Sequence, residues 1–569
     1  MKNEMMVEEL QTKNELTTLK VNGYYIHSKY NPVKEAERLA ENFYKAHHVH
    51  VLFGYGCGYL VDAVLQKMQF EEPLIVIDPL FDDGKIVVQK RHEQLVIFNS
   101  TVIESFNFYL KQFIKDVRLK FQVFCLPNYD RLFPEMYREI LSQVKDVQMS
   151  NQSNDTTLIL NGERWQRNFT DNLFNFTKDY SLALLYQKYS CPVIIASGGP
   201  SLNKQLPLLK KIADKVIIIA AGSTIRSLIA ENIYPQYVLS IDGAEINYTH
   251  FEGLTLDKIR LIYTLFNYPK IRNLFKNPGY VVDTAGWAAF TRYIRNELNV
   301  ELPITGGGAS VANHIFSVAQ YISSGPIALI GQDLAFTNNT THAANNKQTE
   351  KVDENYLKKV RAFQVEGYHG DLVWTTQSLN TMKVNFEESL GYNYPKVPFF
   401  NCTEGGVKIR GFKQSTFQEF CNKYVSNKKI TLVEHDIGEK INYNVEEVIE
   451  KQVKLYDKLI NIFTDGLKEL KTNRSNVVFE ERVLKKLDKI EEKSHEILKK
   501  LPIESIVSPL TLRIKRGYLP KENETKEEAY IRVYNQTKDL YTEMIEAIKN
   551  TKEYTKETLK NIEVGNNNE

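Results

Sequence analysis

The chain has 569 residues, of which 43% are apolar and 25% charged, and its formal net charge is +2 at pH 7. This length exceeds what a single hydrophobic core supports, so we expect about three to four domains. The composition indicates a globular rather than a disordered protein, and the small net charge argues against a dedicated nucleic-acid binder, which would carry a basic face.

Cysteine usage and apolar run lengths bear on the cellular compartment. The N-terminal sequence MKNEMMVEEL lacks the basic start and apolar stretch of a signal peptide, and no run approaches the ~20 apolar residues of a membrane span. The cysteines follow neither a disulfide framework nor a zinc pattern, as in a reducing compartment. We therefore expect a cytoplasmic protein without a membrane span. The five isolated cysteines are Cys57, Cys125, Cys191, Cys402 and Cys421.

The first organised region, within a predicted domain at 1–150, has a Rossmann-like layout. The segment VHVLFGYGCGYL (49–60) predicts a strand, then a turn with three glycines, then a helix. A second predicted strand, LIVID, ends in Asp78, twenty residues after Gly58. This spacing fits a dinucleotide or S-adenosylmethionine site, but it fits equally a turn that only packs strand against helix. Because a G-x-G-x-G pattern alone is weak, we favour the packing interpretation. The glycines are Gly54, Gly56 and Gly58.

The central region, predicted as a domain at 151–425, alternates short β-branched runs with helix-length segments. This pattern predicts a doubly wound parallel sheet with helices on both faces. Ligands of such sheets bind beyond the carboxyl ends of the strands. Polar residues follow four predicted strands there: Ser197 to Ser201, Gly222 and Ser223, Asp242, and Gly331 to Asp333. The predicted strands are VIIAS (193–197), KVIIIAAG (215–222), YVLSID (237–242), IRLIYTLF (259–266), YVVDT (280–284) and PIALIG (326–331).

Two glycine-rich turns precede predicted helices in this region. Small residues at a helix start leave backbone N–H groups free to bind a phosphate, and Ser201 either caps its helix or donates to the same anion. The second turn lies in ITGGGASVANHIF (304–316), whose helix is predicted to begin near Ser310. Each turn alone is also compatible with a simple tight connection. Together they favour a ligand with a phosphate and a second polar part.

From about 426 onward, the chain changes to amphipathic helical periodicity, which predicts an α-helical domain at 426–569. Apolar residues step by three or four along 445–470, 479–490 and 530–548. We favour helices that pack on the α/β region and on one another. The alternative is a surface that docks a protein substrate.

Several motifs in this order resemble those of the motility-associated factor (Maf) family of flagellin glycosyltransferases. They are VIIASGGPSL, VIIIAAGST, SIDG, TGGGASVANHIF, LIGQDLAFT and NCTEGGVKIRGF. The resemblance covers roughly 20–425. The family's central domain is in turn similar to bacterial sialyltransferases that use CMP-activated sugars. The resemblance implies transfer of a pseudaminic or legionaminic acid-like sugar onto Ser or Thr of flagellin; both sugars are nonulosonic acids. The transfer would take place in the cytoplasm, and the protein would bind flagellin alone or with its export chaperone.

The resemblance also implies which residues contact the CMP donor. It brings the first glycine turn and Gly222 with Ser223 to the nucleotide, and the second turn to the donor side. We add Gln332 and Glu404 as donor-binding candidates, although Glu404 would equally cap a helix. The implied turn residues are Gly198, Gly199, Pro200, Ser201 and Leu202 in the first turn, and Thr305, Gly306, Gly307, Gly308 and Ser310 in the second.

Catalytic candidates are Asp242, Asp333, His342 and His369. The sialyltransferases place two tyrosines after the Gly-x-Asp strand end to bind the leaving phosphate, whereas this chain reads QDLAFTNNTTHA, so His342 or the hydroxyls of Thr340 and Thr341 are candidate substitutes. An imidazole titrates near neutral pH, which suits a base. No aspartates form an Asp-x-Asp pair, which favours a mechanism without metal or cofactor, although Asp242 could ligate a single divalent ion.

Two other functions stay open. A pterin pyrophosphokinase is one, because some archaeal proteins share this central domain, although the additional terminal regions argue against it. A methyltransferase-like binding module or flagellar assembly factor that uses the 49–78 turn is the other. Stabilisation by CMP, by ATP with magnesium, or by S-adenosylmethionine would separate the three.

Overall fold

A computed structural model describes residues 5–69, 72–81, 92–106, 109–110, 120–284, 286–306, 308, 310–346, 349–391, 397–521 and 524–566. The chain forms two compact units. One comprises Met1–Leu160, Leu470–Leu484 and Ser508–Leu540, and the other Asn161–Glu469, Lys485–Val507 and Tyr541–Glu569. The division into domains near 150 and 425 stays a prediction.

The first unit contains a four-stranded parallel sheet of order β6-β5-β4-β7. This is the Rossmann-like arrangement that the sequence predicts, with helix α2 (Tyr59–Leu65) directly after β4 and the glycine turn. A small antiparallel sheet, β1-β2-β3, and helix α1 (Pro32–Phe43) precede it. The strands are β1 (Val7–Gln11), β2 (Thr17–Val21), β3 (Tyr24–Tyr25), β4 (His48–Phe53), β5 (Leu74–Ile77), β6 (Leu95–Phe98) and β7 (Lys120–Cys125).

The second unit is built on a parallel sheet of order β14-β13-β12-β11-β10-β9-β15-β18-β19, with β8 paired to β13. Every predicted strand of the central region is present. The strand order reverses at β9, which lies between β10 and β15, so Ile195 is opposite both Ile219 and Leu329. The strands are β8 (Tyr180–Ser181), β9 (Val193–Ala196), β10 (Ile217–Ala221), β11 (Tyr237–Ser240), β12 (Arg260–Thr264), β13 (Tyr280–Thr284), β14 (Ile304–Thr305), β15 (Ile327–Ile330), β18 (Phe399–Asn401) and β19 (Lys413–Gln414).

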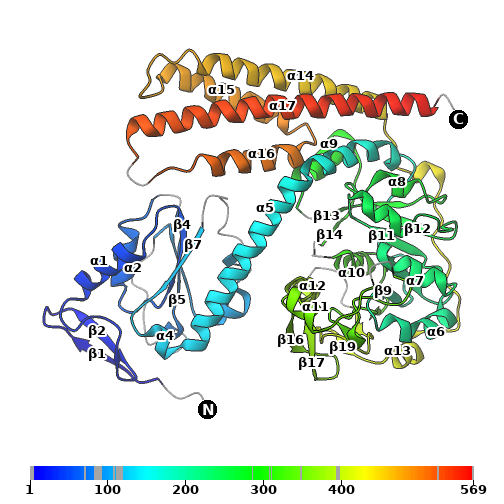
Figure 1. Ribbon diagram of the computed structural model, residues 1–569, viewed down its shortest axis with the longest axis horizontal. Helices are drawn as coiled ribbons and strands as arrows, with labels where there is room; N and C mark the ends of the chain where they lie inside the picture. Colours follow the sequence, from blue (N-terminus) through cyan, green and yellow to red (C-terminus); the bar gives the residue numbers. More distant parts are fainter. Residues whose placement is uncertain are drawn as a thin grey trace. The chain divides into compact units, whose positions relative to one another are not determined.

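Both faces of this sheet are buried, as the near-continuous apolar strands predict. Ile195 of β9 belongs to the core under α10 (Val311–Ile322), whereas its neighbour Ile194 belongs to the core under α6 (Leu202–Ile212). Figure 1 shows α10 beside β9 in the green part of the chain. The remaining helices and a hairpin are α7 (Ile225–Ala230), α8 (Pro269–Arg272), α9 (Ala288–Glu297), α11 (Glu354–Lys359), α12 (Gln377–Glu388), α13 (Phe417–Tyr424), β16 (Phe363–Glu366) and β17 (Leu372–Thr375).

Long helices carry the rest of the chain. Helices α14, α15 and α17 follow the predicted amphipathic segments, and the sequence analysis missed α16, which contains Pro509. In the second unit, Ile449 joins the core of the α/β sheet and Gln452 donates a 2.6 Å hydrogen bond to the Tyr293 hydroxyl, as packing requires. No described helix is long and apolar enough to cross a membrane. The bounds are α4 (Tyr129–Leu132), α5 (Pro134–Phe176), α14 (Val445–Leu470), α15 (Glu481–Leu498), α16 (Glu504–Gly517) and α17 (Lys526–Asn566).

Candidate functional site

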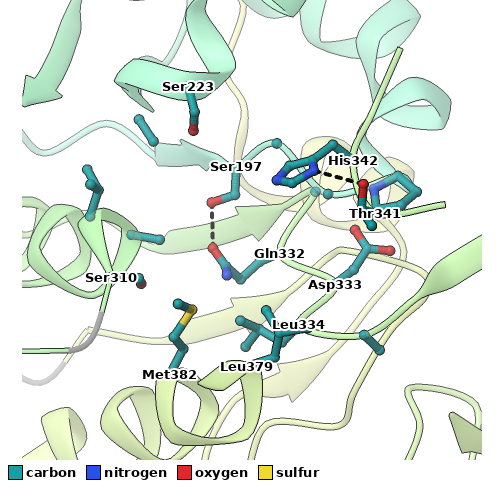
Figure 2. Close-up of a pocket in the computed structure, with 18 of the residues that line it drawn as sticks. Ser197, Ser223, Ser310, Gln332, Asp333, Leu334, Thr341, His342, Leu379 and Met382 are labelled. Atoms are coloured by element: carbon teal, nitrogen blue, oxygen red, sulfur yellow. Dashed lines mark hydrogen bonds between the residues drawn. The ribbon is translucent and has the colours of Figure 1, made fainter. Parts of the chain in front are cut away.

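A cavity of about 500 Å³ opens beyond the carboxyl ends of β9, β10, β11 and β15. It lies where the strand order of the sheet reverses, which is the usual ligand position in open parallel α/β sheets. Predicted site residues from four separate strand ends meet there, and Figure 2 labels the side chains of Ser223, Ser310, Gln332, Asp333 and His342. Those that line the cavity are Gly198, Gly199, Pro200, Ser223, Asp242, Gly308, Ser310, Gln332, Asp333 and His342.

The glycine turn after β9 is packed against the segment after β15. The Gly199 N–H donates to the Gly331 carbonyl oxygen at 2.8 Å. A Cβ at Gly199 would lie 2.1 Å from Asp333 Oδ2 and 2.5 Å from the Gly331 oxygen, closer than any side chain tolerates. Residue 199 must therefore be glycine for the turn to reach this position.

Asp333 holds the glycine turn after β9 through hydrogen bonds to Ser201. Its carboxylate accepts hydrogen bonds from the Ser201 N–H, at 3.2 Å, and from the Ser201 hydroxyl, at 2.7 Å. Asp333 is only 2% exposed, and this burial raises the pKa of its carboxyl group. Ser201 lies beneath the cavity, so both of its donors serve Asp333 instead of an anion, and its side chain does not cap α6. Asp333 therefore acts on the shape of the turn.

Gln332 presents a donor to the cavity. The Ser197 hydroxyl donates to Gln332 Oε1, which fixes the orientation of the side-chain amide (Figure 2). The amide nitrogen, Nε2, donates to no group among the residues that the structure describes. Nε2 of Gln332 is not among the buried polar atoms without a partner, so it is accessible from the cavity and is suited to an acceptor atom of a ligand.

Asp242 is the available carboxylate of the cavity. Its side chain is open to solvent there, and no donor in the described part of the chain binds its oxygens. The surrounding protein nevertheless removes part of its hydration, which raises the pKa of the carboxyl group. A carboxylate with a raised pKa and no hydrogen-bond partner suits a general base.

Two further donors belong to residues that line the cavity at neighbouring strand ends. The Gly198 N–H and the Ser223 hydroxyl find no acceptor within the described residues. The N–H groups of Gly199 and Ser201 in the turn already have protein partners. The N–H of Gly198 is therefore the group of this turn that can bind an anion directly.

His342 reaches the cavity from the loop after β15. Its Nδ1 lies 3.1 Å from the hydroxyl oxygen of Thr341, which also lines the cavity (Figure 2). Thr340 is not part of the lining, and its hydroxyl donates to the Thr337 carbonyl oxygen. No lysine or arginine occurs among the lining residues that the structure describes, so a protonated His342 would be their sole cation. Nor does any group of three metal-ligating side chains occur in the described residues.

Several predicted site residues do not line the cavity. Leu202 is buried in the α6 core, and the space beside Gly222 is taken by the Phe251 ring. The Thr305 hydroxyl donates to the Asp283 carbonyl oxygen, and the Gly306 N–H donates to the Ser317 hydroxyl. Gly307 lies outside the described residues.

His369 and Glu404 also lie away from the lining. His369 is exposed in the turn of the β16–β17 hairpin, with its ring against Tyr368. Glu404 accepts a 2.8 Å hydrogen bond from the Phe417 N–H at the start of α13, which is the capping alternative that the sequence analysis left open.

Sequence analysis missed one side of the cavity. Leu379 and Met382 of α12 line it, and they are spaced so that they share one helical face. The segment between β17 and β18 offers no polar motif, so nothing local in the sequence points to a ligand there.

The other predicted nucleotide turn, after β4, is filled by the protein itself. Asp78 Oδ2 accepts from the Tyr55 N–H at 2.6 Å and from the Gly56 N–H at 3.3 Å, and the Cys57 N–H donates to Nε2 of His27 at 2.9 Å. The ring of Tyr129 covers Gly54, where a Cβ would lie 2.8 Å from it. Asp78 thus occupies the position of an anion, which supports the packing interpretation of this turn.

Comparison with solved structures finds a match over nearly the whole chain. A glycosyltransferase structure, described as Maf glycosyltransferase from Magnetospirillum magneticum AMB-1, matches 99% of this chain and 94% of its own, at 14% identity and a TM-score of 0.58. The chain has the fold of this Maf glycosyltransferase. The predicted fold class is therefore confirmed, and the resemblance to the Maf family holds at the level of the fold.

A second comparison matches the central region alone. Residues 167–339 match a family model described as 6-hydroxymethylpterin diphosphokinase MptE-like. Those residues include β9 to β15 and most of the cavity lining, but not α12. Comparison with curated proteins gives no match.

Proposed function

We propose that this chain is a glycosyltransferase that moves a nonulosonic acid from its CMP donor onto Ser or Thr hydroxyls of flagellin. The observation that carries the proposal is the cavity at the β9 switch point. It combines a glycine turn, an oriented amide donor and an unpaired carboxylate within about 500 Å³. The likeness of the whole chain to the fold of a Maf glycosyltransferase supports the same activity.

The donor phosphate binds at the glycine turn in this proposal. The Gly198 N–H, the Ser223 hydroxyl and the Gln332 amide supply three donors from three strand ends. His342, when protonated, adds the positive charge that stabilises the departing CMP, in place of the tyrosines of the sialyltransferases. Asp333, Ser201 and Gly199 hold the turn in place without contacting the donor.

The transfer step assigns Asp242 as general base. The acceptor hydroxyl oxygen attacks the anomeric carbon of the sugar, and the bond between that carbon and the phosphate oxygen of CMP breaks. The bonding electrons leave with CMP, and the hydroxyl proton passes to the Asp242 carboxylate. Asp242 suits this role better than Asp333, because the oxygens of Asp333 are bound by Ser201 and buried.

The partners and location follow from the acceptor. Flagellin, alone or with its export chaperone, would be modified in the cytoplasm before export, and the modification would be required for flagellum assembly and motility. In this proposal the transfer step uses no cofactor. The alternative is a single divalent ion that Asp242 ligates.

The match of residues 167–339 favours one second candidate, a 6-hydroxymethylpterin diphosphokinase. In that case the same cavity would hold ATP and a pterin, and diphosphate would pass to the pterin hydroxyl. The two functions differ in the nucleotide that the cavity binds.

The test is the intact mass of flagellin co-expressed with this chain and a nonulosonic-acid pathway. We expect a mass increase of one or more sugars that disappears with Asp242→Asn and persists with Asp488→Asn, a matched change on the exposed surface of α15. In a parallel assay, purified protein is given ATP, magnesium and hydroxymethylpterin. Formation of pterin diphosphate, with unmodified flagellin despite confirmed donor synthesis, would replace the first proposal by the second.

A further inference from the structure

A second cavity of the same unit lies at the opposite edge of the sheet from the first. Its volume is about 290 Å³, and it is lined by residues that come just before β8 and just before β13, which are parallel neighbours. These residues lie at the amino ends of the strands, whereas the first cavity opens beyond the carboxyl ends. We call the second cavity the basic pocket, and its polar lining residues are Lys178, Arg272, Asn273, Lys276 and Lys440.

The buried residue Asp179 joins the three segments that form the basic pocket. Its carboxylate accepts from Arg272 Nε at 2.5 Å, from Arg272 Nη2 at 2.6 Å and from the Gly279 N–H at 2.6 Å. Its backbone carbonyl oxygen accepts from the Ile441 N–H at 2.9 Å, which brings the segment of Lys440 against that of Asp179. The basic pocket is therefore assembled by contacts within the protein itself.

Arg272 is the buried cation of the basic pocket, and it is only 6% exposed. A guanidinium has five N–H groups, and three of them donate to the Asp179 carboxylate and, at 2.7 Å, to the Phe275 carbonyl oxygen. The two bonds to Asp179 fix the plane of the guanidinium. Because Arg272 lines the basic pocket and has more donors than these acceptors use, it is suited to bind an anion that enters.

Three lysines add positive charge around Arg272. Lys440 is half-buried and forms no ion pair with any residue that the structure describes. The ammonium of the exposed Lys178 lies 4.2 Å from the centre of the Phe174 ring. Lys276 pairs with Asp257 at 2.8 Å, but exposed pairs of this kind are weak, so Lys276 is able to turn to an anion in the basic pocket. No acidic side chain is among the described lining residues.

The charge of the basic pocket indicates what kind of anion it fits. Four of its side chains are cations, and Asp179 balances the charge of one of them, Arg272. A single phosphate group carries only about 1.5 to 2 negative charges at pH 7, so it leaves part of the remaining positive charge without a counterpart. Two linked phosphate groups match this charge better, and they offer enough oxygens to accept charge-assisted hydrogen bonds from all four cations.

We propose that the basic pocket binds a diphosphate group, either as the free anion or as part of a small organic diphosphate. Arg272 contacts the anion from the buried side, and the three lysines contact it from the solvent side. This site goes beyond the proposed transfer reaction, because none of its residues lines the first cavity. CMP has a single phosphate group and is a much weaker ligand for the basic pocket.

The test is a calorimetric titration of the intact chain with inorganic diphosphate, and separately with ADP, in a buffer without phosphate or divalent ions. We expect saturable binding that is at least about tenfold tighter for inorganic diphosphate than for inorganic phosphate, because the second phosphate group adds charge-assisted hydrogen bonds. Tighter binding of ADP than of inorganic diphosphate would identify an organic diphosphate as the ligand, and the reverse order would identify the free anion.

A double variant then assigns the binding to the basic pocket. Lys178→Gln with Lys440→Gln removes two of its charges, leaves the buried Arg272 in place, and should weaken diphosphate binding by at least about tenfold. The matched control is Lys454→Gln with Lys458→Gln, at two exposed lysines of α14 that do not line the basic pocket. The control removes the same charge and should leave binding unchanged. Equal melting temperatures without ligand show that both double variants are folded.

The outcomes decide between the basic pocket and other sites for the anion. No saturable binding of inorganic diphosphate or ADP by the wild-type chain would overturn the proposal. Equal weakening in both double variants would also overturn it, because only the net charge would then matter. Binding that is lost in Gln332→Leu and kept in Lys178→Gln with Lys440→Gln would place the anion in the first cavity instead. None of these measurements uses sugar transfer, so they stand whether or not the proposed transferase activity does.

Discussion

Two glycine turns of this chain follow parallel strands, and they end in opposite situations. In the first unit, Asp78 and His27 accept hydrogen bonds from three consecutive N–H groups of the turn after β4, and the Tyr129 ring covers its first glycine. In the second unit, Asp333 binds one end of the turn after β9, yet Gly198, Gln332 and Asp242 still face a cavity.

The difference shows that a glycine turn by itself does not predict a ligand site. Glycines permit a close approach of something to the backbone. Whether that something is a ligand or the protein's own side chain depends on residues far away in the sequence. His27 and Tyr129 lie on either side of the first turn in the chain, and neither belongs to a recognisable motif.

The largest effect that we expect is on catalysis, at Asp242. Asp242→Asn should lower kcat/KM for transfer by roughly 10²–10⁴-fold, the usual contribution of a general base, while CMP binding is retained. In the wild-type protein, activity should fall as the pH is lowered through the pKa of Asp242. Because that pKa is raised, the fall should occur at a higher pH than for an ordinary aspartate.

Stability provides the control for this variant. A carboxyl group whose folded pKa is raised costs stability once the pH exceeds its unfolded pKa, because the folded state then holds an ion that it hydrates poorly. Asp242→Asn should therefore leave the melting temperature at pH 7 unchanged or higher. Loss of activity together with a lower melting temperature would contradict the assignment of Asp242 as a base.

The next effect concerns the filled turn and its dependence on pH. Burial lowers the pKa of His27 to about 4, and neutral Nε2 is the acceptor for the Cys57 N–H. The unfolded state then binds more protons between pH 6.5 and 4, so stability is complete above about pH 6.5 and falls as the pH drops toward 4. The loss amounts to roughly 3 kcal/mol for a shift of this size.

Denaturant unfolding of the intact chain at several pH values measures this loss, with hydrogen exchange of the amides of the first unit as the readout. His27→Gln, whose side-chain oxygen can still accept from Cys57, should flatten the dependence between pH 6.5 and 4. A wild-type unit that is equally stable at both pH values would show that His27 does not fill the turn as a neutral acceptor.

The smallest of the three effects concerns the open turn. Gly199→Ala should lower the free energy of unfolding by about 1–3 kcal/mol, as overpacking does, because its Cβ would clash with Asp333 and the Gly331 carbonyl. It should also weaken CMP binding, since the turn must move. Gly438→Ala, at a glycine with open space around it, is the matched control and should change neither quantity.

The sequence predicted the scaffold well, for a physical reason. Strands such as 193–197 and 326–331 are buried on both faces, so their apolar runs are continuous and their polar ends are conspicuous. Because ends of parallel strands meet at one edge, Asp242, Gln332 and the turn after β9 could be placed together without a structure.

The rest was out of reach because it depends on packing between distant segments. No sequence pattern marks Leu379 and Met382 of α12 as cavity residues. The sequence analysis did not predict α16, which contains Pro509. The resemblance also placed Ser201 against the nucleotide, whereas its hydroxyl donates to Asp333, 132 residues later in the chain.

The most direct test of the central claim is a calorimetric titration of the intact chain with CMP. We expect one CMP per chain, binding that weakens at least about tenfold in Gln332→Leu through loss of the amide donor, and unchanged binding in His27→Gln. Two CMP molecules per chain, or binding lost in His27→Gln and kept in folded Gln332→Leu, would contradict the claim that the turn after β9, and not the turn after β4, serves a ligand.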